Sequence, residues 1–159
     1  MGGGIHGGFG ATKGARDVAK GKQRFNSEEA GLIKELERNH KKFTKEDIVF
    51  ITRDQTGQVV WLENGNKKAG LKHILDYGNN GNGHAGDFKK SLGVDRKDIP
   101  TFLKHIITSG TILSTSVIEK GHIKKIKRVY EYNDSFVVLY GIGENGFIVS
   151  AYPINKDKL

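Results

Sequence analysis

The sequence predicts an α+β fold in which N-terminal helices pack on a C-terminal antiparallel sheet of about four strands. Apolar residues recur at helical spacing in several segments before residue 110. From Thr111 onward they alternate with polar residues, as they do in strands. Helices that come first and strands that follow, rather than alternating along the chain, are typical of this class.

The first 26 residues differ in composition from the rest and are expected to form a flexible, basic leader. They are rich in glycine, lack apolar periodicity and carry several Lys and Arg but a single acid, Asp17. Such a composition buries too little apolar surface to offset the entropy cost of ordering the chain. Residues 27–159 are predicted to form a single domain, long enough to bury a core without disulfides.

A capped helix is predicted to open this domain. Asn26-Ser27-Glu28-Glu29 offers a cap residue followed by acids in the first turn, where the helix dipole favours them. Leu32, Ile33 and Leu36 then recur at helical spacing. Lys41 closes the helix at the end that favours positive charge.

Two β-rich runs follow, at 47–53 and 58–63, and are expected to form a hairpin. Asp54-Gln-Thr-Gly57 lies between them and has the composition of a turn. Trp61 is interpreted as a core aromatic, and stacking on a nucleic-acid base is the alternative.

The stretch from Gly70 to His84 carries two histidines around one loop. A short helix is predicted for 69–77, with His73 outside its apolar face. Gly and Asn dominate 79–83, which is therefore expected to be a loop, and His84 follows it directly.

One more helix and four strands complete the prediction. Asp98 and Pro100 suit the first turn of this helix, and Gly110 suits its end. The Asn145-Gly146 pair is the strongest hairpin signal of the chain. Strands are expected at 111–118, 124–132, 135–141 and 146–152.

The strand predicted at 124–132 carries the densest basic run of the chain. Alternation places Arg128, Tyr130 and Tyr132 on one face. This face is costly to bury and suits phosphate binding with aromatic stacking. The alternative is a solvated edge strand whose lysines prevent aggregation. The residues predicted to bind nucleic acid are Lys124, Lys125, Lys127 and Tyr130, together with Lys72 of the short helix.

The last predicted strand places two polar side chains on one face. In Phe147-Ile-Val-Ser-Ala-Tyr-Pro153, alternation puts Ser150 and Tyr152 on the same side. They are expected to point into the same groove as Arg128. The alternative is that Ser150 is a tolerated small residue and Tyr152 an edge aromatic.

The charge of the chain indicates a polyanionic partner. Lys and Arg number 26 against 18 Asp and Glu, which gives a net charge of +8, and there is no Cys. Clustered positive charge favours RNA, DNA or an acidic protein as the partner. The absence of Cys excludes thiol catalysis, zinc ribbons and iron–sulfur clusters. No apolar run approaches the ~20 residues that a membrane-spanning helix needs.

Three segments carry a resemblance to a known family. They are Gly70-Leu-Lys-His-Ile-Leu75, the helix from Asp98 to Gly110, and the closing segment from Val137 to Pro153, which ends in Ser-Ala-Tyr-Pro. Their order resembles the barnase–EndoU–colicin–RelE (BECR) superfamily of metal-independent ribonucleases. The nearest likeness is to the C-terminal toxin domains of bacterial polymorphic toxins, such as those of contact-dependent growth inhibition. The likeness covers residues 69–153 and implies a BECR-like fold and a nuclease toxin domain at 27–159.

The resemblance also implies roles for individual residues. His73 matches the family's helix histidine, and Ser150 matches the hydroxyl residue of the last strand. Arg128 stands where a basic strand residue is expected. His84 resembles the second histidine of EndoU-like members, although its Asn-Gly-His-Ala-Gly setting differs from theirs. Together with Tyr152, which alternation places on the same face as Ser150, these residues make up the predicted catalytic set: His73, Arg128, Ser150, Tyr152 and His84.

These residue types fit RNA cleavage without a cofactor. Attack of the 2′-hydroxyl on the adjacent phosphate requires a base, an acid for the leaving 5′-oxygen, and donors for the charged phosphorane. Histidine suits both proton transfers, each of which typically contributes ~10²–10⁴-fold. Arg can bind phosphate oxygens through two hydrogen bonds, and Ser or Tyr can donate to the same group.

The resemblance further implies partners and a place of action. It implies an RNA substrate, often tRNA, and a cognate immunity protein, which the basic charge predicts to be acidic. The domain would belong to a larger secreted or cell-surface parent protein and act in the cytoplasm of a target cell.

Three other interpretations stay open. The chain could be a non-catalytic nucleic-acid-binding module, in which the basic strand matters and the histidines do not. It could recognise an acidic protein. It could also cleave with a divalent metal, because His73-x-x-Asp76 and His84-x-x-Asp87 repeat a spacing that can coordinate an ion.

Overall fold

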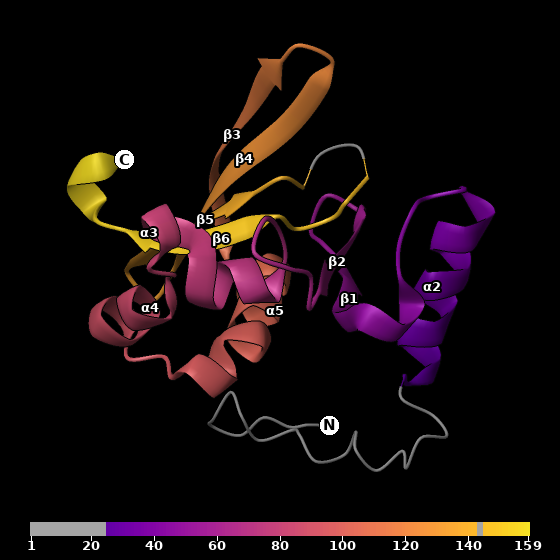
Figure 1. The fold of residues 1–159 in the computed structure, drawn as a ribbon, viewed down its shortest axis with the longest axis horizontal. Coiled ribbons are helices and arrows are strands. Elements are labelled where there is room, and N and C mark those ends of the chain that lie inside the picture. The colour runs from indigo at the N-terminus through magenta and orange to yellow at the C-terminus, as the bar shows by residue number, and fades with distance from the viewer. Residues whose placement is uncertain (1–24, 143–144) are drawn as a thin grey trace.

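The computed structural model describes residues 25–142 and 145–159 and shows an α+β fold (Figure 1). It contains one antiparallel sheet of four strands and a separate sheet of two. The predicted fold class is therefore confirmed. Of the leader predicted for residues 1–26, only Phe25 and Asn26 belong to the described part. Within that part, no helix combines the length and apolarity that crossing a membrane requires.

The first helix, α2 (Ser27–Arg38), begins where the sequence predicts. Asn26 accepts a hydrogen bond from the Glu29 N–H, and the Glu29 side chain accepts one from the Asn26 N–H, so two unpaired donors of the first turn are satisfied. The apolar face of α2 packs against the two-stranded sheet of β1 (Ile48–Arg53) and β2 (Val59–Glu63).

Trp61 lies at the centre of this smaller core. It is fully buried, and its indole N–H donates to Glu63 Oε2 at 2.9 Å. The rings of Phe43 and Phe147 pack edge-on against it, with centroids 6.4 and 5.8 Å away. The interpretation of Trp61 as a core aromatic is confirmed.

A second group of helices packs on the larger sheet. It contains α4 (Ala85–Leu92) and α5 (Ile99–Ser109), joined by a 3₁₀ turn at Arg96–Asp98. Their buried side chains meet Tyr130 and other residues of the sheet in the main core. Ahead of α4 lie a single π-helical turn, His73–Tyr77, and a tight turn, α3 (Gly78–Gly81).

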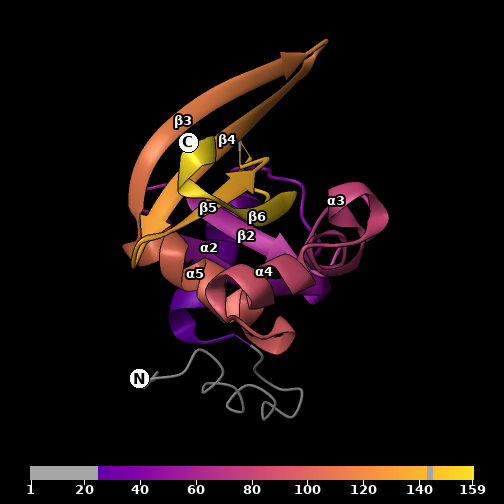
Figure 2. The same ribbon diagram turned by 90° about the vertical axis from the view of Figure 1, so that its left-hand side faces the viewer.

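The four-stranded sheet follows the predicted meander. Its order is β3-β4-β5-β6, and each neighbouring pair is antiparallel. β3 and β4 are longer than β5 and β6, so the far end of their hairpin projects beyond the rest of the sheet (Figures 1 and 2). The strands are β3 (Thr111–Lys120), β4 (Ile123–Tyr132), β5 (Ser135–Tyr140) and β6 (Ser150–Ile154).

The last strand begins later than predicted. The sequence predicts a strand at 146–152, but β6 begins at Ser150. The residues before it bind β2 instead: Trp61 donates its N–H to Gly146 O at 3.0 Å and accepts from the Ile148 N–H at 3.1 Å. This segment therefore joins the two sheets, a non-local pairing that periodicity does not reveal.

Candidate functional site

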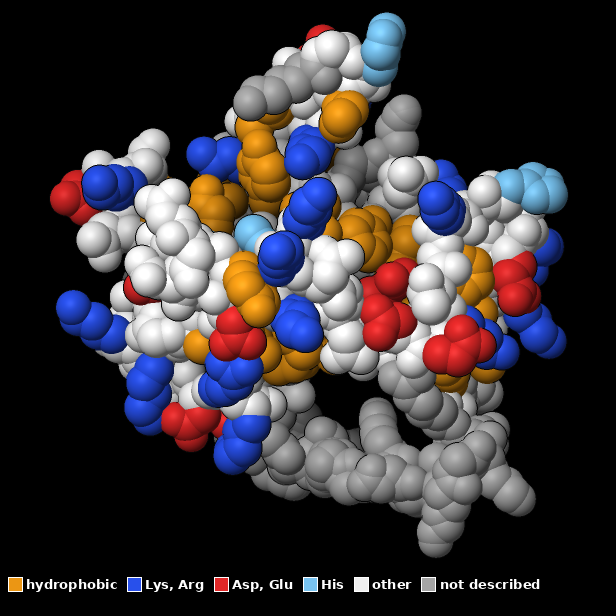
Figure 3. Space-filling model, in the orientation of Figure 1, with side chains coloured by type: hydrophobic (Ala, Val, Ile, Leu, Met, Phe, Trp, Pro, Cys, Tyr) orange, Lys and Arg blue, Asp and Glu red, His pale blue; other side chains and the backbone are white. Residues whose placement is uncertain are grey.

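A cavity of about 500 Å³ opens where the π-helical turn and α3 meet the larger sheet. Figure 3 shows Lys and Arg side chains gathered in a stripe from the projecting hairpin towards the helices below it. The cavity contains four of the five predicted catalytic residues. Among its lining residues are His73, His84, Lys127, Tyr140, Ser150 and Tyr152.

His73 enters the cavity from the first residue of the π-helical turn. Such turns are rare and occur frequently at functional sites. The Nδ1 atom of His73 lies 2.8 Å from the carbonyl oxygen of Lys67. A carbonyl can only accept a hydrogen bond, so Nδ1 donates. Nε2 is then the nitrogen left to exchange a proton with a ligand.

The loop that follows depends on glycine for its shape. Asn79 and Asn80 have φ values of 55° and 58°, in the left-handed region that Asn tolerates better than most residues. Gly83 has a φ of +77°, and a Cβ there would collide with the Leu75 carbonyl. The Gly83 N–H donates to Gly78 O at 2.6 Å, which closes the loop into a tight turn.

This loop places the His84 ring directly against the backbone of Gly78, which has no side chain. The backbone N–H of His84 donates to Ile74 O at 2.7 Å, which ties the loop to the π-helical turn. A Cβ on Gly78 would lie 2.5 Å from Cδ2 and 2.7 Å from Nε2 of the His84 ring. The ring therefore occupies space that only glycine leaves free.

His84 is the more firmly oriented of the two histidines. Its Nδ1 lies 3.0 Å from Asp87 Oδ2, one turn further along the chain, and its side chain is 12% exposed. Its ring stacks on Tyr152, with centroids 5.0 Å apart and an interplanar angle of 22°. Because the carboxylate accepts from Nδ1, Nε2 is again the nitrogen available for proton exchange.

The sheet contributes a cation and three hydroxyls. Lys127 of β4 pairs with Tyr140 of β5, and Tyr140 pairs with Ser150 of β6, so the three side chains lie side by side on one face. Tyr152 lies on the same face, two residues beyond Ser150. Burial, and to a smaller extent the neighbouring Tyr140, raises the pKa of the Tyr152 phenol, which keeps it a hydrogen-bond donor.

Arg128 is not part of this cavity, and the prediction that it shares a groove with Ser150 and Tyr152 is wrong. It pairs across the sheet with Leu139 and lies on the opposite, core-facing side. Its guanidinium donates to Asp54 Oδ2 at 3.2 Å and to Thr115 Oγ1 at 3.1 Å. The Arg128 and Asp54 side chains are 8% and 0% exposed, so this is a buried ion pair.

Tyr130 is also buried, and the prediction that it contacts RNA is wrong for the same reason. It is 1% exposed and belongs to the main core. Its hydroxyl has no hydrogen-bond partner among the described residues. Desolvation raises its pKa, which the nearby Arg128 partly offsets.

The predicted RNA-binding lysines lie at three places. Lys127 lines the cavity that contains His73 and His84, called here the histidine cavity. Lys124 and Lys125 line a second cavity at the hairpin tip. Lys72 is exposed and lies just before the π-helical turn, outside both linings.

Sequence reasoning missed Tyr140. Tyr140 lies at the end of a strand, opposite the predicted Ser150. Because residues paired across strands share a face, this position could have indicated that Tyr140 belongs to the site. Tyr77, Asn79 and Asn80 of the loop also line the cavity. Their placement depends on the left-handed turn, which composition alone does not specify.

Of the two acids of the His-x-x-Asp repeats, Asp76 pairs with Arg96 and Asp87 pairs with the histidine of its own repeat. Arg96 donates to both carboxylate oxygens of Asp76, at 2.7 and 3.0 Å, and lowers its pKa. Asp87 orients His84. Within residues 25–142 and 145–159, no three His, Cys, Asp or Glu side chains are grouped so that they could hold a metal ion.

The arrangement therefore offers two oriented imidazoles, one ammonium group and several hydroxyl donors around one cavity. This set can transfer protons and stabilise negative charge on a bound anion. No protein-family model matches the sequence, and no curated protein matches it either.

Proposed function

We propose that the protein is an endoribonuclease that cleaves RNA by attack of a 2′-hydroxyl on the adjacent phosphate, without a metal. One observation carries this proposal. Two histidines, each with Nδ1 held by an acceptor, line the same cavity as Lys127. Such a reaction needs a base, an acid and a cation, and the cavity supplies one candidate for each role.

His84 is proposed as the base. The Asp87 carboxylate stabilises the imidazolium that forms when Nε2 takes the proton of the 2′-hydroxyl. The 2′-oxygen bonds to phosphorus and the bond from phosphorus to the 5′-oxygen breaks. His73 donates a proton to that leaving oxygen, and a 2′,3′-cyclic phosphate remains on the other fragment.

The sheet residues are proposed to bind the phosphate. Lys127 offsets the extra negative charge of the phosphorane, the role that the sequence assigns to Arg128. The hydroxyls of Ser150, Tyr152 and Tyr140 lie on the same face and can donate hydrogen bonds to the phosphate oxygens.

Cleavage of a single-stranded RNA by His84→Ala and His73→Ala proteins tests the proposal. Each variant should cleave at least about 10²-fold more slowly than the wild type, the usual contribution of one proton-transfer group. His40→Asn is a matched control, because His40 is an exposed histidine with left-handed φ beyond the end of α2.

Three further measurements complete this test. The product should end in a 2′,3′-cyclic phosphate, a 2′-deoxy residue at the cleavage site should block the reaction, and EDTA should leave the rate unchanged. Full activity in both histidine variants would contradict the proposal. Inhibition by EDTA would favour the metal-dependent alternative. Tight RNA binding without any cleavage would favour the non-catalytic binding module.

The biological setting is proposed from the family resemblance. The ribonuclease would act as a toxin, delivered from a secreted parent protein into a target cell, with tRNA as its substrate and an acidic immunity protein as its inhibitor. The net charge of +8 supports an acidic partner. Induction in bacterial cytoplasm should arrest growth and fragment tRNA, and His84→Ala should abolish both effects. Growth arrest with intact RNA would contradict this setting.

A further inference from the structure

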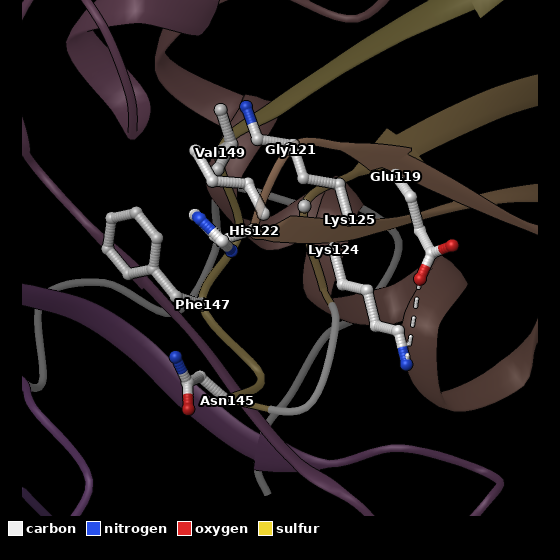
Figure 4. A pocket seen from close by; sticks show the side chains of 10 residues that line it. Glu119, Gly121, His122, Lys124, Lys125, Asn145, Phe147 and Val149 are labelled. Atoms are coloured by element: carbon white, nitrogen blue, oxygen red, sulfur yellow. Dashed lines mark ion pairs between the residues drawn. The ribbon is translucent and has the colours of Figure 1, made fainter.

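A second cavity, of about 550 Å³, lies at the tip of the β3–β4 hairpin (Figure 4). The hairpin supplies Lys124 and Lys125 on one side. Asn145 and Phe147, from the segment that leads to β6, lie on the other side, and His122 lies between the two groups in this view.

Lys125 connects the second cavity to the histidine site. It lines the second cavity, and its ammonium group lies 5.7 Å from the centre of the Tyr140 ring, which lines the first. Its partner across the hairpin, Ile118, also lines the first cavity. The phosphate backbone of an RNA that runs from the histidine cavity along the hairpin would therefore pass Lys127 and then Lys125.

The second cavity combines cations with apolar surface. Lys124 is 58% exposed, and Glu119, 3.8 Å from it, offsets only part of the local positive charge. Phe147 packs one edge on Trp61 and stays half-buried, so part of its ring borders the cavity. Ile123 at the tip is 58% exposed. An aromatic ring beside lysines is the combination that binds single-stranded nucleic acid by stacking a base and pairing its phosphate.

We propose that this second cavity is a nucleotide subsite, and that the substrate is single-stranded RNA long enough to span both cavities. The inference rests on the proposed ribonuclease function and names the substrate class of that site. In a duplex the base faces are stacked inside, whereas an unpaired base can turn outward onto Phe147. The subsite thus selects loops and unpaired ends over helical RNA.

Two substrates of different length test the subsite. A dinucleotide fills only the histidine cavity, whereas a single-stranded oligoribonucleotide reaches both cavities. Phe147→Leu keeps an apolar group against Trp61 and removes the stacking surface, and Lys124→Ala removes an exposed charge with no core contact. Lys34→Ala, an exposed lysine of α2, is the matched control for charge.

The KM for the oligonucleotide should rise about tenfold in Phe147→Leu and Lys124→Ala, the size of one lost stacking or phosphate contact. The kinetics on the dinucleotide, and those of Lys34→Ala on both substrates, should match the wild type. Unchanged KM values in both subsite variants would overturn the inference, as would equal losses on both substrates in well-folded protein.

A binding measurement separates this inference from the proposed function. The wild type could fail to cleave either substrate, in which case the ribonuclease proposal is wrong. Fluorescence anisotropy with the same oligonucleotide in 2′-deoxy form then decides about the subsite. Weaker binding by both variants would support a nucleotide site in the second cavity, and equal binding would refute it.

Discussion

Lys127 and Arg128 are neighbours in β4, yet their side chains lie on opposite faces of the sheet. Lys127 lines the histidine cavity, whereas Arg128 is buried against Asp54. Asp54 also accepts hydrogen bonds from the backbone of Thr56 and Gln58 through Oδ1, so it holds the β1–β2 turn as well. A single residue step thus separates a side chain that lines the cavity from one that is buried in an ion pair.

Truncation of the two side chains should have opposite consequences. Arg128→Ala leaves the Asp54 carboxylate buried without its counter-ion and should lower the free energy of unfolding by about 3–5 kcal/mol. Lys127→Ala should leave that free energy within about 0.5 kcal/mol, as for surface positions, and should slow RNA cleavage. Urea denaturation measures the first effect and initial rates measure the second. A stable but inactive Arg128→Ala protein would restore the catalytic role that the sequence suggests.

The sequence predicts the alternation in β4 but not which face is covered. Arg128, Tyr130 and Tyr132 do share a face, as period two requires. That face is the core because Asp54, 74 positions earlier in the chain, supplies the charge that allows Arg128 to be buried. No local pattern contains this information.

At the scale of elements, the loop between His73 and His84 decides how the site is built. Its Gly and Asn content predicts a loop, and a loop is present. Composition does not predict that Gly78 leaves room for the His84 ring or that Tyr152 stacks on its other side. For this reason the sequence favours His73, whereas the structure gives His84 the better-oriented imidazole.

A single methyl group on this loop should separate folding from activity. Gly78 has a φ of −67° and a ψ of 179°, which Ala can adopt, so the added Cβ collides with the His84 ring, while the next atom, the carbonyl oxygen of His73, lies 3.4 Å away at ordinary contact distance. The ring must move, and misplacement of a catalytic group by about 1 Å can reduce the rate 10²-fold. RNA cleavage should fall by about this factor, while circular dichroism remains that of the wild type.

Gly86→Ala is the control for this loop variant. Gly86 lies in α4 with no atom within 4 Å of an added Cβ. Ala there should stabilise the helix by about 1 kcal/mol and leave cleavage unchanged. Equal rates in Gly78→Ala and wild-type protein would show that the position of His84 does not matter for the reaction.

At the scale of the whole molecule, the two-stranded sheet joins two cores, because Phe50, Val60 and Leu62 lie in the main core and other side chains of β1 and β2 lie in the smaller one. Further connections are made by single side chains. Phe147 packs on Trp61, Arg128 binds Asp54, and the Gln55 amide donates to the carbonyl oxygens of Ile107 and Gly110 at the end of α5. Helix and strand positions follow from local periodicity and are largely predicted. These connections link segments far apart in the chain. For this reason the sequence does not predict where β6 begins or that Arg128 is buried.

The spatial order of the lysines leads to a prediction about the whole molecule. Lys127 lines the histidine cavity, Lys125 lies beside Tyr140 of that cavity and also lines the second cavity, and Lys124 lines the second cavity. A single-stranded RNA that places three phosphates on these lysines should release counter-ions in proportion to the number of phosphates bound. The logarithm of its association constant should therefore fall with the logarithm of the salt concentration, with a slope of about −2. Binding to cleavage-deficient His84→Ala protein, measured over a range of salt concentrations, gives this slope.

Two lysine variants distinguish a defined path from general attraction by the net charge of +8. Lys127→Ala and Lys34→Ala each remove one positive charge, but only Lys127 lies on the proposed path. Lys127→Ala should reduce the magnitude of the slope by about 0.7, and Lys34→Ala should leave it unchanged. Equal reductions would mean that RNA is held by the overall electrostatic field of the protein, and the lysines of the two cavities would then lose their role as the binding path.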